Sequence, residues 1–147
     1  MLRIEIISFA SSPGRHIAAM EQEYVERLSS WCGVEIRSEV ESRKSRVLKE
    51  LEERGGRCTR IMLDEAGDTM SSKEFAHLLS TRMNQGISRL AILIGPADGW
   101  EESDLTAADS VLSISKMTFT AHLCRLLILE QIYRAFSILR GTAYHRD

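Results

Sequence analysis

Apolar runs and helix-like stretches alternate from one end of the chain to the other. Runs rich in β-branched and aliphatic residues predict five strands, at Leu2–Ser8, Val34–Arg37, Arg60–Asp64, Leu90–Ile94 and Val111–Ile114. Apolar positions at helical spacing predict helices at Arg15–Trp31, Ser42–Arg54, Ser72 to about Gly86, Ser103–Asp109 and Ala121–Leu139. This alternation is typical of a single α/β domain with a mainly parallel sheet.

The loops at the carboxyl ends of the strands are the expected ligand sites, because parallel sheets bind ligands there. We therefore expect a site at the loops that follow Leu63, Ile94 and Ile114. The loop Gly95–Gly99 matches neither the dinucleotide-binding nor the P-loop fingerprint. Its two glycines would let backbone approach a ligand closely, although an ordinary strand-to-helix turn has the same composition.

The last predicted helix is unusually apolar. One side of it carries a stripe made of Leu129, Ile132, Phe136 and Leu139, and Arg125 lies one turn before that stripe. Such a helix is either central in the fold or shared with a partner subunit. An arginine on its apolar side must reach solvent or meet an anion. A structural ion pair and a ligand contact both satisfy that requirement.

Composition and charge narrow the class of protein. The chain has 147 residues, 44% hydrophobic and 27% charged, which excludes disordered and collagen-like classes. Its net charge of −2 shows no overall basic bias, but residues 116–147 alone carry a net charge of +3. The terminal Tyr144-His145-Arg146 contains residue types that stack on bases and contact phosphates, and a frayed polar tail is the alternative.

The three cysteines, Cys32, Cys58 and Cys124, show no metal-ligand spacing, so we expect no metal site and reduced thiols in a cytoplasmic protein. No segment has the length and apolar character of a membrane span or a signal peptide, so no membrane association is expected.

The second half of the chain carries motifs that resemble those of the RlmH (YbeA-type) group of SPOUT methyltransferases. The loop Leu93-Ile-Gly-Pro-Ala-Asp-Gly99 resembles that group's L-I-G-G-P-E-G. The segments Ser113–Thr118 and Glu130–Ser137 resemble L-S-x-x-T and E-x-x-Y-R-A-x-S, and Tyr144-His-Arg146 resembles the terminal Y-H-R/K. The chain is similar to a divergent member, since Pro96 replaces a loop glycine and has no N–H.

The resemblance implies a fold class and an assembly. The expected fold is a SPOUT-type α/β domain, with a Rossmann-like parallel sheet and a C-terminal trefoil knot. Residues 1–147 would form this single SPOUT methyltransferase domain, with the knot at approximately residues 90–147. The resemblance also implies a homodimer packed through the final helix, which would account for the width of that helix's apolar surface.

The resemblance further implies a cofactor and a substrate. S-adenosyl-L-methionine would lie bent in the knot, with contacts at Leu63, Gly95, Pro96, Gly99, Ser115, Lys116, Met117, Thr118, Phe119 and Thr120. Members of the group methylate N3 of a pseudouridine in helix 69 of large-subunit (23S) rRNA. The corresponding RNA contacts would be Arg125, Arg134, Tyr144, His145 and Arg146, with the tail completing the partner's site.

The implied reaction is direct displacement at a sulfonium methyl, which depends on alignment and on loss of the imide proton. His145 is the only titratable ring at a motif-matched position, so it is the candidate base, and Arg125 is a candidate for stabilising the imide anion. No metal is needed. Two other hypotheses remain open: a divergent enzyme with another RNA or small-molecule acceptor, and a non-enzymatic dimeric module that binds RNA or ribosomes.

Overall fold

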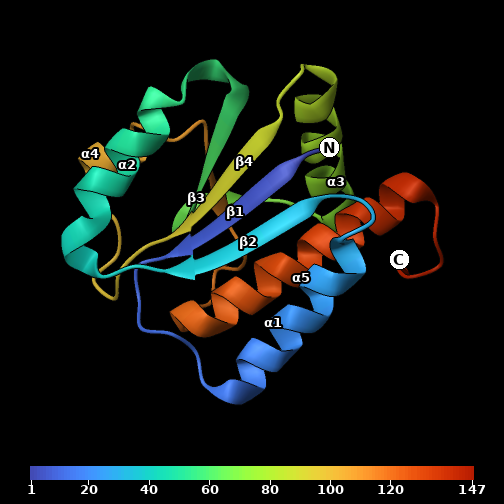
Figure 1. Ribbon diagram of the computed structural model, residues 1–147, viewed down its shortest axis with the longest axis horizontal. Helices are drawn as coiled ribbons and strands as arrows, with labels where there is room; N and C mark the ends of the chain where they lie inside the picture. The colour runs from blue at the N-terminus through green and yellow to red at the C-terminus, as the bar shows by residue number, and fades with distance from the viewer.

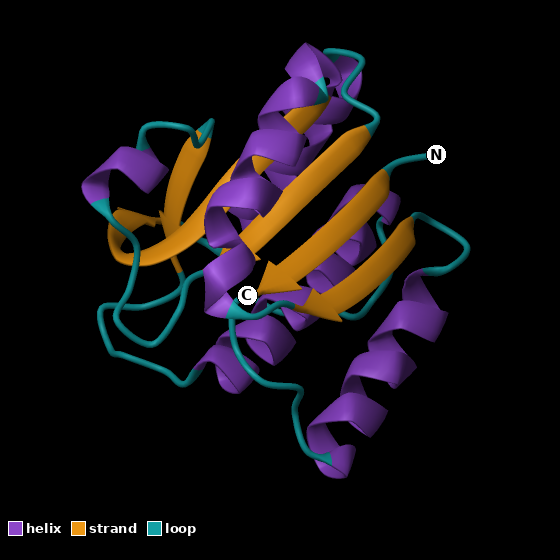
Figure 2. Cartoon of the chain, turned by 60° about the vertical axis from the view of Figure 1, so that its left-hand side comes forward, coloured by secondary structure: helices purple, strands orange, loops and turns teal.

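A five-stranded sheet with helices on both faces forms the protein in the computed structural model, which describes residues 1–147 (Figures 1 and 2). The strands are β1 (Arg3–Ser8), β2 (Gly33–Ser38), β3 (Cys58–Thr69), β4 (Arg89–Ile94) and β5 (Ser110–Ser113). The helices are α1 (Arg15–Leu28), α2 (Lys44–Glu53), α3 (Ser72–Asn84), α4 (Glu102–Leu105) and α5 (Ala121–Arg140), with 3-10 turns at Glu41–Arg43 and Gly55–Arg57. The strand order is β2-β1-β4-β3-β5 and every pairing is parallel, which confirms the predicted α/β class.

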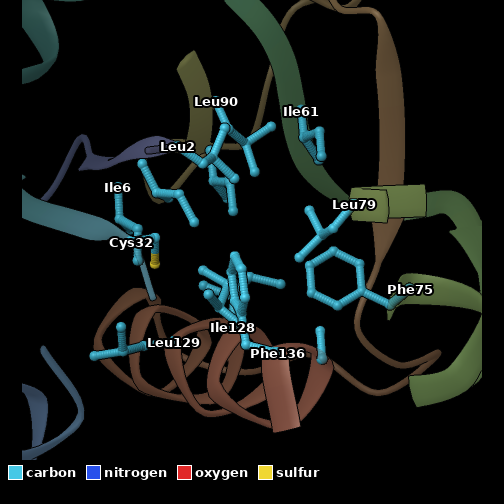
Figure 3. Packing of buried hydrophobic residues seen from close by; sticks show 14 of the residues in the cluster. Leu2, Ile6, Cys32, Ile61, Phe75, Leu79, Leu90, Ile128, Leu129 and Phe136 are labelled. Carbon is cyan, nitrogen blue, oxygen red and sulfur yellow. The ribbon is translucent and has the colours of Figure 1, made fainter. Parts of the chain in front are cut away.

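The sheet separates two apolar cores, and strand alternation assigns side chains to them. In β1, Ile4 and Ile6 join the larger core beneath α1, α3 and α5, whereas Ile7 joins the smaller core beneath α2. Ile128 of α5 lies in the middle of the larger core, opposite the strand side chains (Figure 3). The central position of α5 follows from this packing. None of the helices combines the length and apolar character needed to span a membrane.

Three elements, α1, α4 and β3, differ from the prediction by more than two residues at one end. Helix α1 ends at Leu28 rather than Trp31, because the Trp31 N–H donates to the Leu28 carbonyl in a closing turn. Trp31 still packs against α5, where its ring stacks on Tyr133 and Phe136. The segment predicted as a helix at Ser103–Asp109 forms one turn, Glu102–Leu105, because the Asp109 carboxylate accepts the Arg60 backbone N–H at 2.7 Å and binds that segment to β3.

Strand β3 is longer than the predicted Arg60–Asp64. It pairs with β5 up to Leu63, and the pairing resumes at Asp68, with the intervening residues bulged out of register. The bulge residues Asp64-Glu-Ala-Gly67 show no apolar alternation, so apolar patterning did not reveal it. Gly67 lies so close to β5 that an added Cβ would meet the Val111 carbonyl oxygen at 2.7 Å. The bulge lets β3 continue past Ile94, its last partner in β4, and end beside Ser113 of β5.

Arg125 lies on the buried side of α5 and forms an ion pair with Glu21 of α1. Its Nη2 donates to a Glu21 carboxylate oxygen at 2.8 Å, and its Nη1 donates to the Ser38 hydroxyl at 2.9 Å. The two charged side chains are only 4% and 6% exposed. The anion that this arginine meets therefore belongs to its own chain, and the pair joins α5 to α1 and to the end of β2.

We expect Arg125→Met to lower the free energy of unfolding by about 3–5 kcal/mol, because it leaves the Glu21 carboxylate buried without a counter-charge. Urea denaturation followed by circular dichroism measures this loss. The double variant Glu21→Met/Arg125→Met removes both charges and should recover most of the stability. A single variant with unchanged stability and lost RNA binding would instead identify Arg125 as a ligand contact.

Candidate functional site

One cavity of about 710 Å³ opens at the carboxyl ends of the strands. The loops after Leu63, Ile94 and Ile114 all line it, as their predicted placement at one sheet edge requires. The loop after β1, residues 9–11, forms a further wall, and the first residues of α5 close one side. The structure thus confirms that the segments after Leu63, Ile94 and Ile114 lie together at one edge of the sheet.

The residues expected to hold a cofactor gather at this cavity with one exception. The lining includes Leu63, Gly95, Pro96, Gly99, Ser115, Met117, Thr118, Phe119 and Thr120. Lys116 does not line the cavity, since its side chain is exposed on the outer surface of its loop. The parallel topology therefore brings residues that are far apart in the sequence onto one surface.

Local hydrogen bonds hold two of these loops in shape. The Gly99 N–H donates to the Pro96 carbonyl at 2.8 Å and closes a turn, and the chain leaves that turn through a positive φ of 79° at Gly99. In the loop after β5, the Met117 N–H donates to the Ser115 hydroxyl at 3.0 Å. The Thr118 hydroxyl donates to the Glu65 carboxylate at 2.8 Å, which ties this loop to the β3 bulge.

The side chains that line the cavity are acidic or uncharged. They include Glu41, Asp64, Glu65 and Asp98 and no lysine, arginine or histidine. Carboxylates around a partly enclosed space favour a ligand that carries positive charge. Burial raises the pKa of the Cys124 thiol, so the only lining cysteine stays protonated and is a poor nucleophile. No cluster of three or more His, Cys, Asp or Glu side chains is arranged to hold a metal ion.

The C-terminal tail folds back onto α5 and forms a second group of candidate residues. The Tyr144 hydroxyl donates to the Glu130 carboxylate at 3.0 Å, and Arg134 pairs with the same carboxylate at 2.6 Å. The Arg134 guanidinium also lies 4.9 Å from the Tyr144 ring centroid, and its Nη1 lies 3.3 Å from His145 Nδ1. Burial raises the pKa of Tyr144, so its hydroxyl remains a donor.

The structure brings Arg134, Tyr144 and His145 together, with Arg146 exposed beside them, and leaves Arg125 in its separate buried pair. No residue of this tail cluster lines the cavity. Helix α5 starts at the cavity and the tail packs near its other end, so Ala121 and Arg134 are separated by roughly 20 Å at 1.5 Å per residue (Figure 1). Within one chain, the tail and the cavity are separate sites.

Several lining residues were not selected from the sequence. Phe9 follows β1, and Glu65 lies in the β3 bulge, directly after the predicted strand Arg60–Asp64, so position after a predicted strand was the only available signal. Trp100 follows the glycine loop, and its indole N–H donates to the Leu63 carbonyl at 2.8 Å. Nothing in the spacing of Trp100 and Leu63 indicates this contact, because it depends on how the loop after β4 packs against β3.

Curated proteins match the chain over its full length. The "Ribosomal RNA large subunit methyltransferase H" of Koribacter versatilis (strain Ellin345) is 35% identical, and the alignment covers 98% of each chain. The protein of that name from Acetivibrio thermocellus is also 35% identical, over 99% of this chain and 100% of the relative. That of Geotalea daltonii is 29% identical, over 98% and 99%.

A solved structure supports the fold assignment. The SpoU methyltransferase AviRb from Streptomyces viridochromogenes, in complex with the cofactor AdoMet, aligns with a TM-score of 0.52 and 15% identity. The alignment covers 90% of this chain and 57% of that chain, so this protein corresponds to little more than half of it. A family model described as "Predicted SPOUT methyltransferase" matches residues 2–145. Since this match spans almost the whole sequence, the chain belongs to the SPOUT methyltransferase family.

Proposed function

We propose that this protein transfers a methyl group from S-adenosylmethionine to large-subunit ribosomal RNA. The observation that carries the proposal is that the loops bearing the family's cofactor motifs meet at one cavity. The names of the full-length relatives support ribosomal RNA as the substrate. The solved SpoU methyltransferase, crystallised with AdoMet, supports the choice of cofactor.

The cavity fits this cofactor in size and charge. Its volume of about 710 Å³ lies within the range typical of small-molecule sites. Its four lining carboxylates suit the positive charge of a sulfonium. Gly95, Gly99 and the Ser115–Thr120 loop expose backbone for polar contacts, and Pro96 can contribute only its carbonyl. When bound, the cofactor supplies an electrophilic methyl group on sulfur.

His145 is the side chain that we propose as the base for the acceptor nitrogen. Arg134 can only donate hydrogen bonds, so the His145 Nδ1 beside it must accept, and the ring proton then lies on Nε2. Nε2 is 3.2 Å from an Asp147 carboxylate oxygen, so both ring nitrogens have polar partners within the tail cluster. To act as the base, His145 would have to exchange its contact with Arg134 for one with the acceptor nitrogen.

A homodimer built on α5 would bring the tail of one chain to the cavity of the other. Three exposed apolar side chains, Phe119, Leu123 and Leu127, form a stripe that runs from the cavity toward the tail cluster. Their exposed fractions are 37%, 43% and 36%. Residues four apart on a helix share a face, so Leu123 and Leu127 form one surface for a second copy. An antiparallel α5 pair would place cationic tail residues over a cavity that has no cation of its own.

On the basis of the family resemblance we propose two further features. One is a C-terminal trefoil knot at approximately residues 90–147, and the other is methylation at N3 of a pseudouridine in helix 69. A SPOUT enzyme with another RNA acceptor would share the cavity and the tail. A non-enzymatic RNA-binding module would keep the tail and the dimer but would not bind the cofactor.

The acceptor can be identified by mass spectrometry of nucleosides from 23S rRNA. We expect a strain that lacks this protein to lose one methylated pseudouridine, which plasmid-borne wild-type protein restores. Purified protein with S-adenosylmethionine should methylate ribosomes from that strain. If all large-subunit pseudouridines keep their methylation, the proposed acceptor is wrong. If the protein does not bind S-adenosylmethionine at millimolar concentration in calorimetry, it is not a methyltransferase.

Removal of Tyr144–Asp147 tests the role of the tail. We expect the truncated protein to lose methyl transfer while its affinity for S-adenosylmethionine changes by less than about twofold, because no tail residue lines the cavity. Calorimetry and a ribosome methylation assay measure the two quantities. Sedimentation should show that the truncated protein remains a dimer. An equal loss of cofactor affinity and transfer would place the tail in the cofactor site or in the fold.

A further inference from the structure

Trp100 connects two of the segments that line the cavity. We propose that Trp100 is a positioning residue that fixes the Gly95–Gly99 loop against the end of β3 and thereby sets the affinity for S-adenosylmethionine. This inference rests on the proposed function and assigns a role to a residue outside the motifs that carry the family resemblance.

The hydrogen bond joins the loop after β4 to strand β3. The Trp100 indole N–H donates to the Leu63 carbonyl oxygen at 2.8 Å, and both residues line the cavity. Leu63 is the last residue of β3 that pairs in register with β4, where its partner is Ile94. The bulge of β3 begins immediately after it. The indole therefore holds a carbonyl at the point where β3 leaves the regular sheet.

The close contact involves Gly95, the first residue after β4. A Cβ added to Gly95 would lie 3.0 Å from the Trp100 Cε2 and 3.1 Å from its Nε1. Such distances are tighter than ordinary Cβ contacts, so the indole lies directly against the Gly95 backbone. Glycine at this position allows Trp100 to reach Leu63, because a side chain would push the indole away from the carbonyl.

The ring itself is anchored in the smaller core. Phe9 meets it edge-to-face, with centroids 5.8 Å apart and an interplanar angle of 83°. Leu48 and Leu105 pack at the same partly buried margin of that core. The indole is thus part of the fixed wall of the cavity rather than a free lid. Its N–H adds a directional constraint that packing alone does not supply.

The consequence is a loop that is ordered before ligand binds. Proline fixes φ at Pro96, the Gly99 N–H closes the turn onto the Pro96 carbonyl, and Trp100 ties the end of the loop to Leu63. A loop already held in its binding shape loses less conformational entropy on binding. Loss of the indole N–H should therefore weaken cofactor binding more than it slows transfer at saturating cofactor.

Trp100→Phe tests this prediction, because it keeps an aromatic ring and removes the N–H donor. We expect its Kd for S-adenosylmethionine and for S-adenosylhomocysteine to rise about fivefold to tenfold in calorimetry, as loss of one hydrogen bond predicts. At saturating cofactor, kcat should stay within about twofold of wild type. Trp31→Phe is the matched control, since Trp31 lies beside Tyr133 and Phe136 and does not line the cavity.

The Gly95 contact gives an independent test. We expect Gly95→Ala to weaken cofactor binding strongly in the wild-type background and much less in a Trp100→Ala background, where no indole remains to be displaced. Equal effects in the two backgrounds would contradict coupling through the indole. The Trp31→Phe protein retains Trp100 as its one tryptophan, so its emission should change as S-adenosylhomocysteine binds.

Wild-type cofactor affinity in folded Trp100→Phe would overturn the proposal and leave Trp100 as a packing residue. If Trp100→Phe does not unfold cooperatively, the tryptophan emission of the Trp31→Phe protein replaces its affinity as the test of the proposal. Unchanged Trp100 emission at saturating ligand would then overturn the proposal. If wild-type protein binds neither S-adenosylmethionine nor S-adenosylhomocysteine, the proposed function itself fails, which is a distinct outcome.

Discussion

The parallel direction of all five strands is the constraint on which the rest of the structure depends. It places the ends of β1, β4 and β5 and the bulge of β3 at one edge, so these segments meet although they are far apart in the sequence. The helices then cover the two faces, and α5 starts at the same edge. The cavity and the contacts among its walls follow from that shared direction, whereas its acidic lining follows from the residues at those positions.

Helix α5 has a buried side and an exposed side, and its sequence serves both. Its inner side contributes to the larger core and carries Arg125, whose charge is balanced by Glu21 within the same chain. Its outer side exposes Leu123 and Leu127 between the cavity and the tail cluster. The cationic residues of the tail cluster lie near the end of α5 away from the cavity.

Much of the fold could be predicted from the sequence, because local patterning determined it. The continuous apolar run of Leu90–Ile94 indicated a strand buried on both faces, and the motifs around Gly95 and Thr118 located two walls of the cavity. Other features depend on contacts between distant segments. The partner of Arg125, the bulge in β3 and the reach of Trp100 to Leu63 arise only when separate elements pack, so periodicity and spacing gave no sign of them.

We infer that the bulge of β3 and the loops after β4 and β5 together hold S-adenosylmethionine. A crystal structure of the protein with S-adenosylmethionine tests this claim most directly. The account predicts ligand density inside the cavity, with the sulfonium near the acidic lining and contacts from the Gly95–Gly99 and Ser115–Thr120 backbones. Ligand density at any other place on the molecule, with this cavity left to solvent at saturating ligand, would contradict it.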